Sequence, residues 1–319
     1  MPYLFAHFRE KMTPDGEQIH FALSRDGYQW ESVNAGKPVI TCKKGERGCR
    51  DIEIVRLFGG GFIILATDLC IVRRMDENHH IDWKKAGSTG SKCISMWKSD
   101  DLIHFSDQQF ISFEKYNFGC LWAPEVFFIK ESREYLIHWS ATVSDDAYSH
   151  MAIYCCRTKD FESFTDPELF FSKENEVLDS HIVKIDGRYH LFYKNSGEPL
   201  MNMHAVSDKL FGEYTDDKTF EDYMNTLYRP GSYEAPTTYV LPDGKWCLML
   251  DFFGCEKEKM GYVPFVSDSP GNAQFKMDKE DFRFPYGFKH GRVIEISEKE
   301  YKHIYNHYNK RGNENEKDG

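Results

Sequence analysis

The chain has 319 residues, a net charge of −11 and an aromatic content of 15%. An acidic chain repels phosphate backbones, which argues against a nucleic-acid partner, and no apolar run reaches the roughly 18 residues that a membrane helix needs. The first residues lack the features of a secretory signal, and the nine cysteines do not suggest a disulfide framework, so we expect a cytoplasmic protein without a membrane partner.

The N-terminal segments at residues 3–8 and 20–24, with the stretch that runs to residue 40, are predicted strands. Their aromatic and β-branched residues favour pleated, half-buried surfaces. They resemble the outer strands of a repeat whose first strand lies elsewhere in the chain.

Four later stretches share a pattern in which an acid precedes an apolar or β-branched run. The acids are Asp51, Glu125, Asp179 and Glu234. The last three are spaced by roughly 55 residues, within reach of the longer propeller repeats. The first gap is longer, and a polar insertion at residues 70–92 accounts for the difference. We interpret each run as the first strand of a repeat.

Each first strand is followed by a hairpin and then by a turn signature. Asp186-Gly187 and Asp243-Gly244 lie between apolar runs, which is the strongest short-range hairpin signal. A Ser/Thr-x-Asp-like turn followed by an aromatic residue recurs at residues 21–30, 96–105, 154–164, 205–214 and 265–275. Each repeat therefore supplies four short strands, the content of one propeller blade.

The same spacing, continued beyond Glu234, leads to a fifth strand headed by His290. No hairpin follows it, and the N-terminal strands would supply the missing outer strands. The sequence therefore predicts an all-β, five-bladed β-propeller of four-stranded blades, closed by pairing of the N- and C-terminal strands. Ser297 and Glu300 form a capping box that predicts a short helix over about residues 298–308. We expect a single propeller domain at residues 1–308 and a disordered polar tail at residues 309–319.

The first strand of a propeller blade lines the axis, so the four acids and His290 are expected to face one central site. Converging carboxylates are costly unless they bind a cation, share protons or face a polar ligand. Three interpretations compete: glycoside hydrolysis by a pair of carboxyl groups, a calcium-type metal site that includes His290, and a binding propeller without chemistry.

The residues around these acids resemble glycoside hydrolase family 43, in a branch with α-L-arabinofuranosidase and β-xylosidase-like members. The resemblance covers nearly the whole chain. Its motifs are Trp122-Ala123-Pro124-Glu125, Asp51 after Arg50, Leu178-Asp179, Glu234-Ala235-Pro236, His290-Gly291, residues 21–27 and residues 66–69.

The resemblance implies an inverting mechanism in which Asp51 is the general base, Glu234 is the general acid and Asp179 tunes the acid and orients it. Glu125 would have a supporting, hydrogen-bonding role. Trp122, His290, Asp68 and Lys194 are the candidates for contacting the sugar, and each of these except His290 has an ordinary structural interpretation as well. Two positions depart from the family pattern: Ile52 replaces the proline after the base, and Ala235 replaces the glycine after the acid.

We therefore expect an exo-acting glycosidase that removes terminal α-L-arabinofuranosyl or β-D-xylosyl units from oligosaccharides. It would require no cofactor, and a structural Ca²⁺ at the propeller axis near His290 is the candidate metal. A non-catalytic carbohydrate-binding propeller is the alternative. The sequence leaves the sugar, the linkage and the oligomeric state open.

Overall fold

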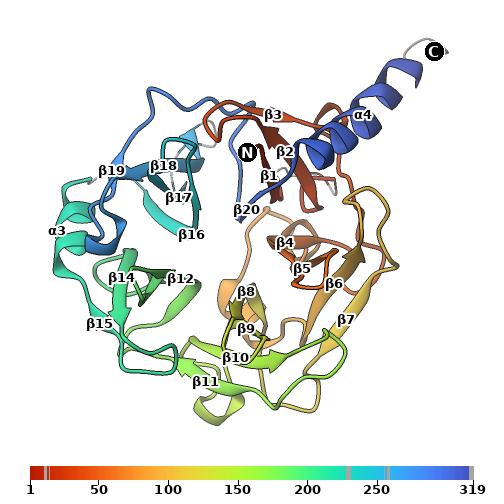
Figure 1. Cartoon of the computed structure of the whole chain (residues 1–319). Helices are drawn as coiled ribbons and strands as arrows, with labels where there is room; N and C mark the ends of the chain where they lie inside the picture. The colour runs from red at the N-terminus through yellow and green to blue at the C-terminus, as the bar shows by residue number, and fades with distance from the viewer. Residues whose placement is uncertain (11–12, 14, 228–230, 255, 257–258, 316–319) are drawn as a thin grey trace.

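The computed structural model describes residues 1–315 except for 11–12, 14, 228–230, 255 and 257–258, and side chains are described as far as residue 309. Within these residues the protein is built almost entirely from short antiparallel strands, arranged as four-stranded units around a common axis (Figure 1). The expectation of an all-β fold made of four-stranded units is confirmed. The units that follow one another along the chain are β4 (Cys49–Arg56) to β7 (Gln109–Ser112), β8 (Trp122–Ile129) to β11 (Glu168–Phe171), β12 (Val177–Ile185) to β15 (Thr215–Asp216), and β16 (Ser232–Val240) to β19 (Lys276–Met277).

The second and third strands of each unit follow from the hairpin signals in the sequence. These strands are β5 (Phe62–Asp68), β6 (Cys93–Ser99), β9 (Glu134–Ala141), β10 (Ala152–Thr158), β13 (Arg188–Asn195), β14 (Met201–Ser207), β17 (Trp246–Phe253) and β18 (Gly261–Ser267). At the β12–β13 turn, Asp186 and Gly187 have φ values of 51° and 85°. Positive φ at both central residues is the requirement of a type I′ hairpin turn, which explains the Asp-Gly pair.

The recurrent Ser/Thr-x-Asp turn also has a structural reason. Ser99 Oγ accepts a hydrogen bond from Leu102 N at 2.9 Å, and Asp101 Oδ1 accepts bonds from Ile103 N and His104 N at 3.0 and 2.8 Å. Such side chains accept hydrogen bonds from the backbone N–H groups of the turn that follows the third strand. The same arrangement recurs at residues 24–29 and 158–163.

The two ends of the chain meet in one further unit. Strand β1 (Tyr3–His7) pairs with β20 (Gly291–Glu295) on one side and with β2 (His20–Ser24) on the other, and β3 (Trp30–Ser32) follows β2. A single parallel pair, Gly291 with Ile52, joins this unit to β4. The expected pairing of N- and C-terminal strands is therefore present, with β20 next to the axis (Figure 1).

Buried apolar side chains fill the space between neighbouring units. One cluster joins Leu191 and Phe192 of β13 to Leu248 and Phe265 of the next unit. Because each unit buries both of its faces against neighbours, the positions of the inner strands depend on the whole ring rather than on any one sheet.

The α-helices of the described residues lie outside the four-stranded units. They are α1 (Ile71–Arg74) and α2 (Trp83–Ser88) within the polar insertion, α3 (Lys218–Thr226) after β15, and α4 (Glu298–Asn315). No helix in the described parts of the chain is both long enough and apolar enough to span a bilayer.

The C-terminal helix starts where the capping box predicts. Ser297 Oγ accepts from Glu300 N at 3.2 Å, and Glu300 Oε2 accepts from Ser297 N at 2.7 Å. The helix continues to Asn315, beyond the end expected at residue 308, while the disorder expected of the tail stays a prediction. No proline stops the helix there, and Gly312 weakens it by only about 1 kcal/mol. Residues 316–319 lie outside the described part.

Candidate active site

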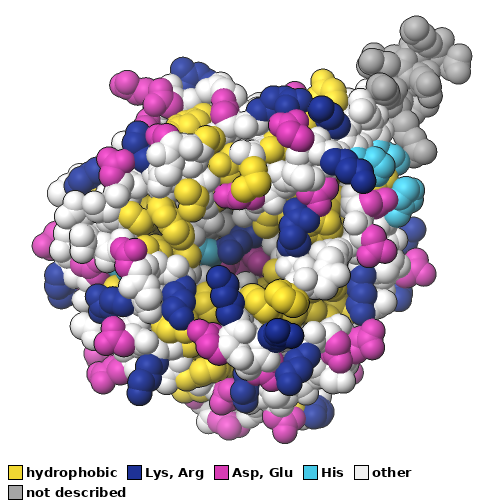
Figure 2. All heavy atoms as spheres, in the orientation of Figure 1, with side chains coloured by type: hydrophobic (Ala, Val, Ile, Leu, Met, Phe, Trp, Pro, Cys, Tyr) yellow, Lys and Arg dark blue, Asp and Glu magenta, His cyan; other side chains and the backbone are white. Residues whose placement is uncertain are grey.

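The axis opens on one face of the molecule into a cavity of about 750 Å³. Figure 2 shows this hollow at the centre of the face, with acidic, basic and histidine side chains at its base and apolar side chains around it. The lining includes most of the candidates from the sequence: Asp51, Asp179, Glu234, Trp122, Lys194 and His290.

The inner strands of the four consecutive units share one irregularity. Each has a β-bulge near its start, where the register with the second strand shifts. The first bulge residue has a left-handed backbone, with φ of 48–54° at Asp51, Ala123, Asp179 and Ala235. Such a backbone is unfavourable for residues with a Cβ and is tolerated best by Asp and Asn, so strain accumulates at the mouth of the ring.

This bulge corrects the expectation that the four acids occupy equivalent positions. Asp51 and Asp179 are equivalent, whereas Glu234 stands one position before the bulge residue and Glu125 two positions after it. Side chains alternate between the two faces of a strand, and the bulge interrupts that alternation. The acids at the heads of the four runs therefore do not all point the same way. The three acids at 51, 179 and 234 line the cavity, and Glu125 lies deeper.

Asp51 is held in its charged form. Its Oδ1 lies 3.1 Å from His290 Nδ1, and its Oδ2 accepts a hydrogen bond from Thr67 Oγ1 at 2.7 Å. Burial raises the pKa of Asp51, but His290, Arg50 and Thr67 outweigh this effect and lower it to about 2. Burial lowers the pKa of His290, and the charge of Asp51 reverses that shift and raises it to about 9. The two side chains therefore form a carboxylate–imidazolium pair at neutral pH.

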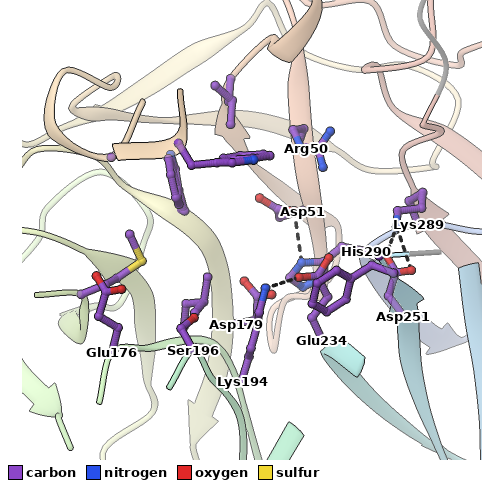
Figure 3. A pocket seen from close by; sticks show the side chains of 18 of the residues that line it. Arg50, Asp51, Glu176, Asp179, Lys194, Ser196, Glu234, Asp251, Lys289 and His290 are labelled. Atoms are coloured by element: carbon purple, nitrogen blue, oxygen red, sulfur yellow. Dashed lines mark hydrogen bonds and ion pairs between the residues drawn. The ribbon is translucent and has the colours of Figure 1, made fainter. Parts of the chain in front are cut away.

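Asp179 has the opposite tendency. Burial raises the pKa of its carboxyl to about 6, supported by the charges of Glu234 and Asp51 and opposed by His290 and Lys194. Its backbone N donates to Ser140 Oγ at 3.0 Å, which fixes the bulge. Figure 3 shows Asp179 between the Asp51–His290 pair and Lys194. Two carboxyl groups of one site thus have pKa values that differ widely, which is a common property of acid–base sites.

Glu234 is bound by a lysine from the preceding unit. Lys194 Nζ lies 2.6 Å from Glu234 Oε2, and the side chains are only 13% and 21% exposed. This contact belongs to a series. On the second strand of each unit, the polar residue that pairs beside the bulge binds the start of the next inner strand or the residues just before it. The series is Thr67 to Ala123 N, Ser140 to Asp179 N, Lys194 to Glu234, and Asp251 to Lys289.

The last contact of this series adds a second buried ion pair beside the acid. Lys289 Nζ lies 2.8 Å from both carboxylate oxygens of Asp251 and 3.1 Å from Glu10. Asp251 pairs directly with Glu234 across β16 and β17. Burial and the charge of Glu234 raise the pKa of Asp251 to about 7, against the attraction of Lys289. Lys289 and His290 are consecutive, so one dipeptide binds acids on both sides of the site (Figure 3).

Glu125 lies below the cavity in a buried polar cluster. Its Oε2 is 2.8 Å from His181 Nδ1 and 3.7 Å from Arg292 Nη1. His181 Nε2 contacts Thr238 Oγ1 at 2.8 Å. Every group in this set has a partner of its own, which agrees with the supporting role expected for Glu125.

A family model described as "Probable glycosyl hydrolase domain", related to glycoside hydrolase family 43, matches residues 1–302. The chain belongs to this glycosyl hydrolase family. The resemblance seen in the sequence is confirmed. An α-L-arabinofuranosidase of Bifidobacterium longum subsp. longum is 24% identical in an alignment of 207 residues that covers 58% of this chain and only 19% of that relative.

Solved structures of such glycosyl hydrolases share the fold. A thermostable family-43 glycoside hydrolase matches with a TM-score of 0.52 and 16% identity over 77% of each chain. The endo-arabinase from Bacteroides thetaiotaomicron matches with a TM-score of 0.51 and 15% identity, over 78% of this chain and 95% of that one. At these identities the comparison establishes the architecture.

In this member of the family, the insertion between β5 and β6 also reaches the cavity. Trp83, Lys84 and Gly87 of its helix α2 belong to the lining. The rings of Trp83 and Trp122 meet edge to face, with centroids 6.1 Å apart. Trp122 therefore lies at the cavity as predicted, in contact with an aromatic residue that the sequence had not singled out.

Asp68 lies outside this lining. It is 4% exposed, and its Oδ1 accepts a hydrogen bond from Glu46 N at 2.9 Å. The carboxylate lies under the loop at residues 45–46, where it holds the backbone. Asp68 therefore has the contacts of the ordinary strand-end residue that the sequence also offered as an interpretation.

The residues around His290 do not fit a Ca²⁺ ion. Calcium takes six to eight oxygen ligands, whereas His290 is bound to Asp51 and the nearby Lys194 and Lys289 are cations. No group of three or more His, Cys, Asp or Glu side chains with metal-binding geometry occurs among the described residues. The candidate metal near His290 therefore has no suitable donor set.

Sequence reasoning missed three kinds of site residue. Asp251 comes from a second strand, whereas the acidic pattern in the sequence marks first strands. Lys289 immediately precedes His290, and a buried lysine cannot be recognised without its partners. Trp83 is an isolated aromatic residue within a polar insertion, and this isolation is the signal that could have identified it as a site residue.

Proposed function

We propose that the protein is a five-bladed β-propeller glycoside hydrolase that removes a terminal α-L-arabinofuranosyl or β-D-xylosyl unit from an oligosaccharide with inversion. Membership of a glycosyl hydrolase family and the likeness to an α-L-arabinofuranosidase support the reaction class. The observation that carries the proposal is that Asp51, Asp179 and Glu234, from three inner strands, line one cavity.

Asp51 would act as the general base. A base must be ionised to accept a proton from water, and the low pKa of Asp51 keeps it ionised at any moderate pH. His290 Nδ1 and Thr67 Oγ1 fix the direction of the carboxylate. In an inverting enzyme the attacking water would lie between this carboxylate and the face of the sugar opposite to the leaving group.

Glu234 would protonate the leaving oxygen. In the structure Lys194 occupies one of its carboxylate oxygens, so this contact has to loosen before Glu234 donates a proton. Asp179 has a raised pKa, so it is the carboxyl group that would most readily gain or lose a proton when substrate binds. The acid and the base come from different units, and an inverting enzyme needs its two carboxyl groups about 6.5–9.5 Å apart so that a water fits between them.

A nitrophenyl glycoside screen tests this function. The purified protein is offered nitrophenyl α-L-arabinofuranoside, β-D-xyloside and β-D-galactoside, and we expect release from one of the first two. Proton NMR of the active reaction should show that the first sugar formed has the opposite anomeric configuration to the substrate. Retained configuration would contradict the assigned mechanism.

The second candidate function is a carbohydrate-binding propeller without hydrolysis. Two observations favour it: the Lys194–Glu234 ion pair and the left-handed backbone of Ala235, next to Glu234. Titration calorimetry with xylo- and arabino-oligosaccharides separates the two functions. Heat of binding without any release from the aryl glycosides would support the binding protein and overturn the enzyme.

A further inference from the structure

The charged groups of the cavity lie at its base, while the insertion contributes an aromatic residue at its edge. Asp51, Asp179 and Glu234 are mostly buried, whereas Trp83 is 51% exposed. Trp83 lies beside Trp122, which stands at the same register position as Glu234. Of the two rings, Trp83 is the more exposed, since Trp122 is half-buried.

Helix α2, which carries Trp83, is fastened to the next unit. Thr142 Oγ1 donates to Gly87 O at 2.6 Å, and Gly90 N donates to Gly119 O at 2.7 Å. A Cβ on Gly87 would lie 3.7 Å from the edge of the Trp122 ring, so the helix packs directly against that ring. The insertion is thus held in place, and Trp83 is an exposed aromatic residue on a fixed support.

Trp83 differs from other exposed aromatic residues, such as Phe58 and Phe211, in that it lines the cavity. Its ring meets that of Trp122 edge to face, and about half of the residue's surface, 51%, stays exposed. Flat aromatic faces are suited to the C–H face of a sugar ring, which buries apolar area without losing the hydrogen bonds of its hydroxyl groups. A sugar that stacks on Trp83 would be a ring that extends outward from the bond that is cut.

We propose that Trp83 forms a subsite for the leaving-group sugar, in which its indole face stacks against the first ring beyond the bond that is cut. This inference rests on the proposed hydrolase function and names the part of the substrate that the insertion recognises. The terminal unit would occupy the base of the cavity beside Asp51 and Glu234, and the departing sugar would lie over Trp83. The protein would therefore prefer oligosaccharides over glycosides with small leaving groups.

The test compares two substrates of the sugar series that the wild type hydrolyses. One is the disaccharide, xylobiose or arabinobiose, whose leaving group is a sugar ring. The other is the matching glycosyl fluoride, whose leaving group has no ring to stack. For Trp83→Ala we expect kcat/KM to fall roughly tenfold or more on the disaccharide and to change less than about twofold on the fluoride. Trp83→Phe should recover part of the loss.

Phe211→Ala is the matched control. Phe211 is 52% exposed, much like Trp83, and it packs against Phe170 away from the cavity lining. It should leave both substrates unaffected. Equal losses on disaccharide and fluoride in Trp83→Ala, or no loss on either, would overturn the subsite while the hydrolase function stands. A wild type that hydrolyses neither substrate would overturn the function itself, and the subsite with it.

Discussion

At the scale of single residues, the Asp51–His290 pair is the best-defined part of the site. The two groups change pKa in opposite directions, to about 2 and about 9, because each stabilises the charge of the other. Thr67 and Arg50 add to the effect on Asp51. Under the proposed function, this pair would combine a fixed base with a fixed positive charge beneath the bound sugar.

His290→Gln should lower the free energy of unfolding by an amount that depends on pH, because it removes one partner of this pair. The raised pKa of His290 contributes stability that is complete below the ordinary histidine pKa of 6.5 and is lost as pH rises through about 9. The lowered pKa of Asp51 contributes stability above 3.8 that is lost as pH falls through about 2. The variant should therefore be less stable than the wild type by on the order of 2 kcal/mol near pH 5–6.

Urea unfolding of both proteins at pH 5.5, 7.5 and 9.5 measures this difference. We expect it to shrink as the pH approaches and passes about 9. A difference that stays constant over this pH series would show that His290 contributes packing alone.

At the scale of elements, α4 is bound to the ring by one face. Tyr301, Ile304 and Tyr308 are buried with Phe21 and Leu102 in one cluster. The capping box fixes where the helix begins, and these contacts fix how it lies against β2 and the turn after β6. Helical stability in proteins comes mainly from such packing.

Ile304→Ala should destabilise the protein by about 2–5 kcal/mol, because Ile304 is fully buried and its removal leaves a cavity. Lys302→Ala, on the exposed side of the same helix, should change stability by less than about 0.5 kcal/mol. Chemical denaturation of the two variants checks this. Similar losses in both would mean that the helix is stabilised by its own propensity rather than by docking.

At the scale of the whole molecule, closure depends on the contact between the two chain ends. Gly291 of β20 lies against β1 so closely that a Cβ would stand 2.1 Å from Ala6 O and 2.8 Å from His7 Cα. A side chain at this position cannot be accommodated without separating the two strands. The ring therefore closes over a glycine, next to the histidine that binds Asp51.

Gly291→Ala should cost on the order of 3 kcal/mol or more, because strand β1 has to move away from β20. Gly59→Ala is the control, since a Cβ there meets nothing within 4 Å. The melting temperature of each variant is the measurement. A wild-type melting temperature in Gly291→Ala would contradict the closure described here.

Much of the architecture could be predicted because its signals are local. Asp186-Gly187 specifies a hairpin and Ser99 with Asp101 specifies a turn, whatever the rest of the chain does. Even the pairing of the chain ends followed from counting strands. The β-bulges could not be predicted, since their left-handed residues at Ala123 and Ala235 are imposed by neighbouring strands.

The candidate site was predictable to the same degree. Residues at the heads of first strands, such as Asp51, Asp179 and Glu234, follow from the repeat and line the cavity. The sequence left two interpretations of Asp68 open, because only the structure shows that the preceding residue, Thr67, is the one that binds Asp51. Partners that come from other elements, such as Asp251 and Trp83, depend on tertiary contacts that no local pattern records.

The central claim is that Asp51 and Glu234 perform different halves of one hydrolysis. It is tested most directly by measuring kcat/KM for Asp51→Asn and Glu234→Gln on aryl glycosides whose leaving groups range from dinitrophenol to phenol. Asp51→Asn should lose roughly 10²–10⁴-fold on every substrate, because water activation is required for each. Glu234→Gln should lose that much on the phenyl glycoside and little on the dinitrophenyl glycoside, which needs no protonation. Losses independent of leaving group in both variants, or wild-type rates in either, would contradict the account.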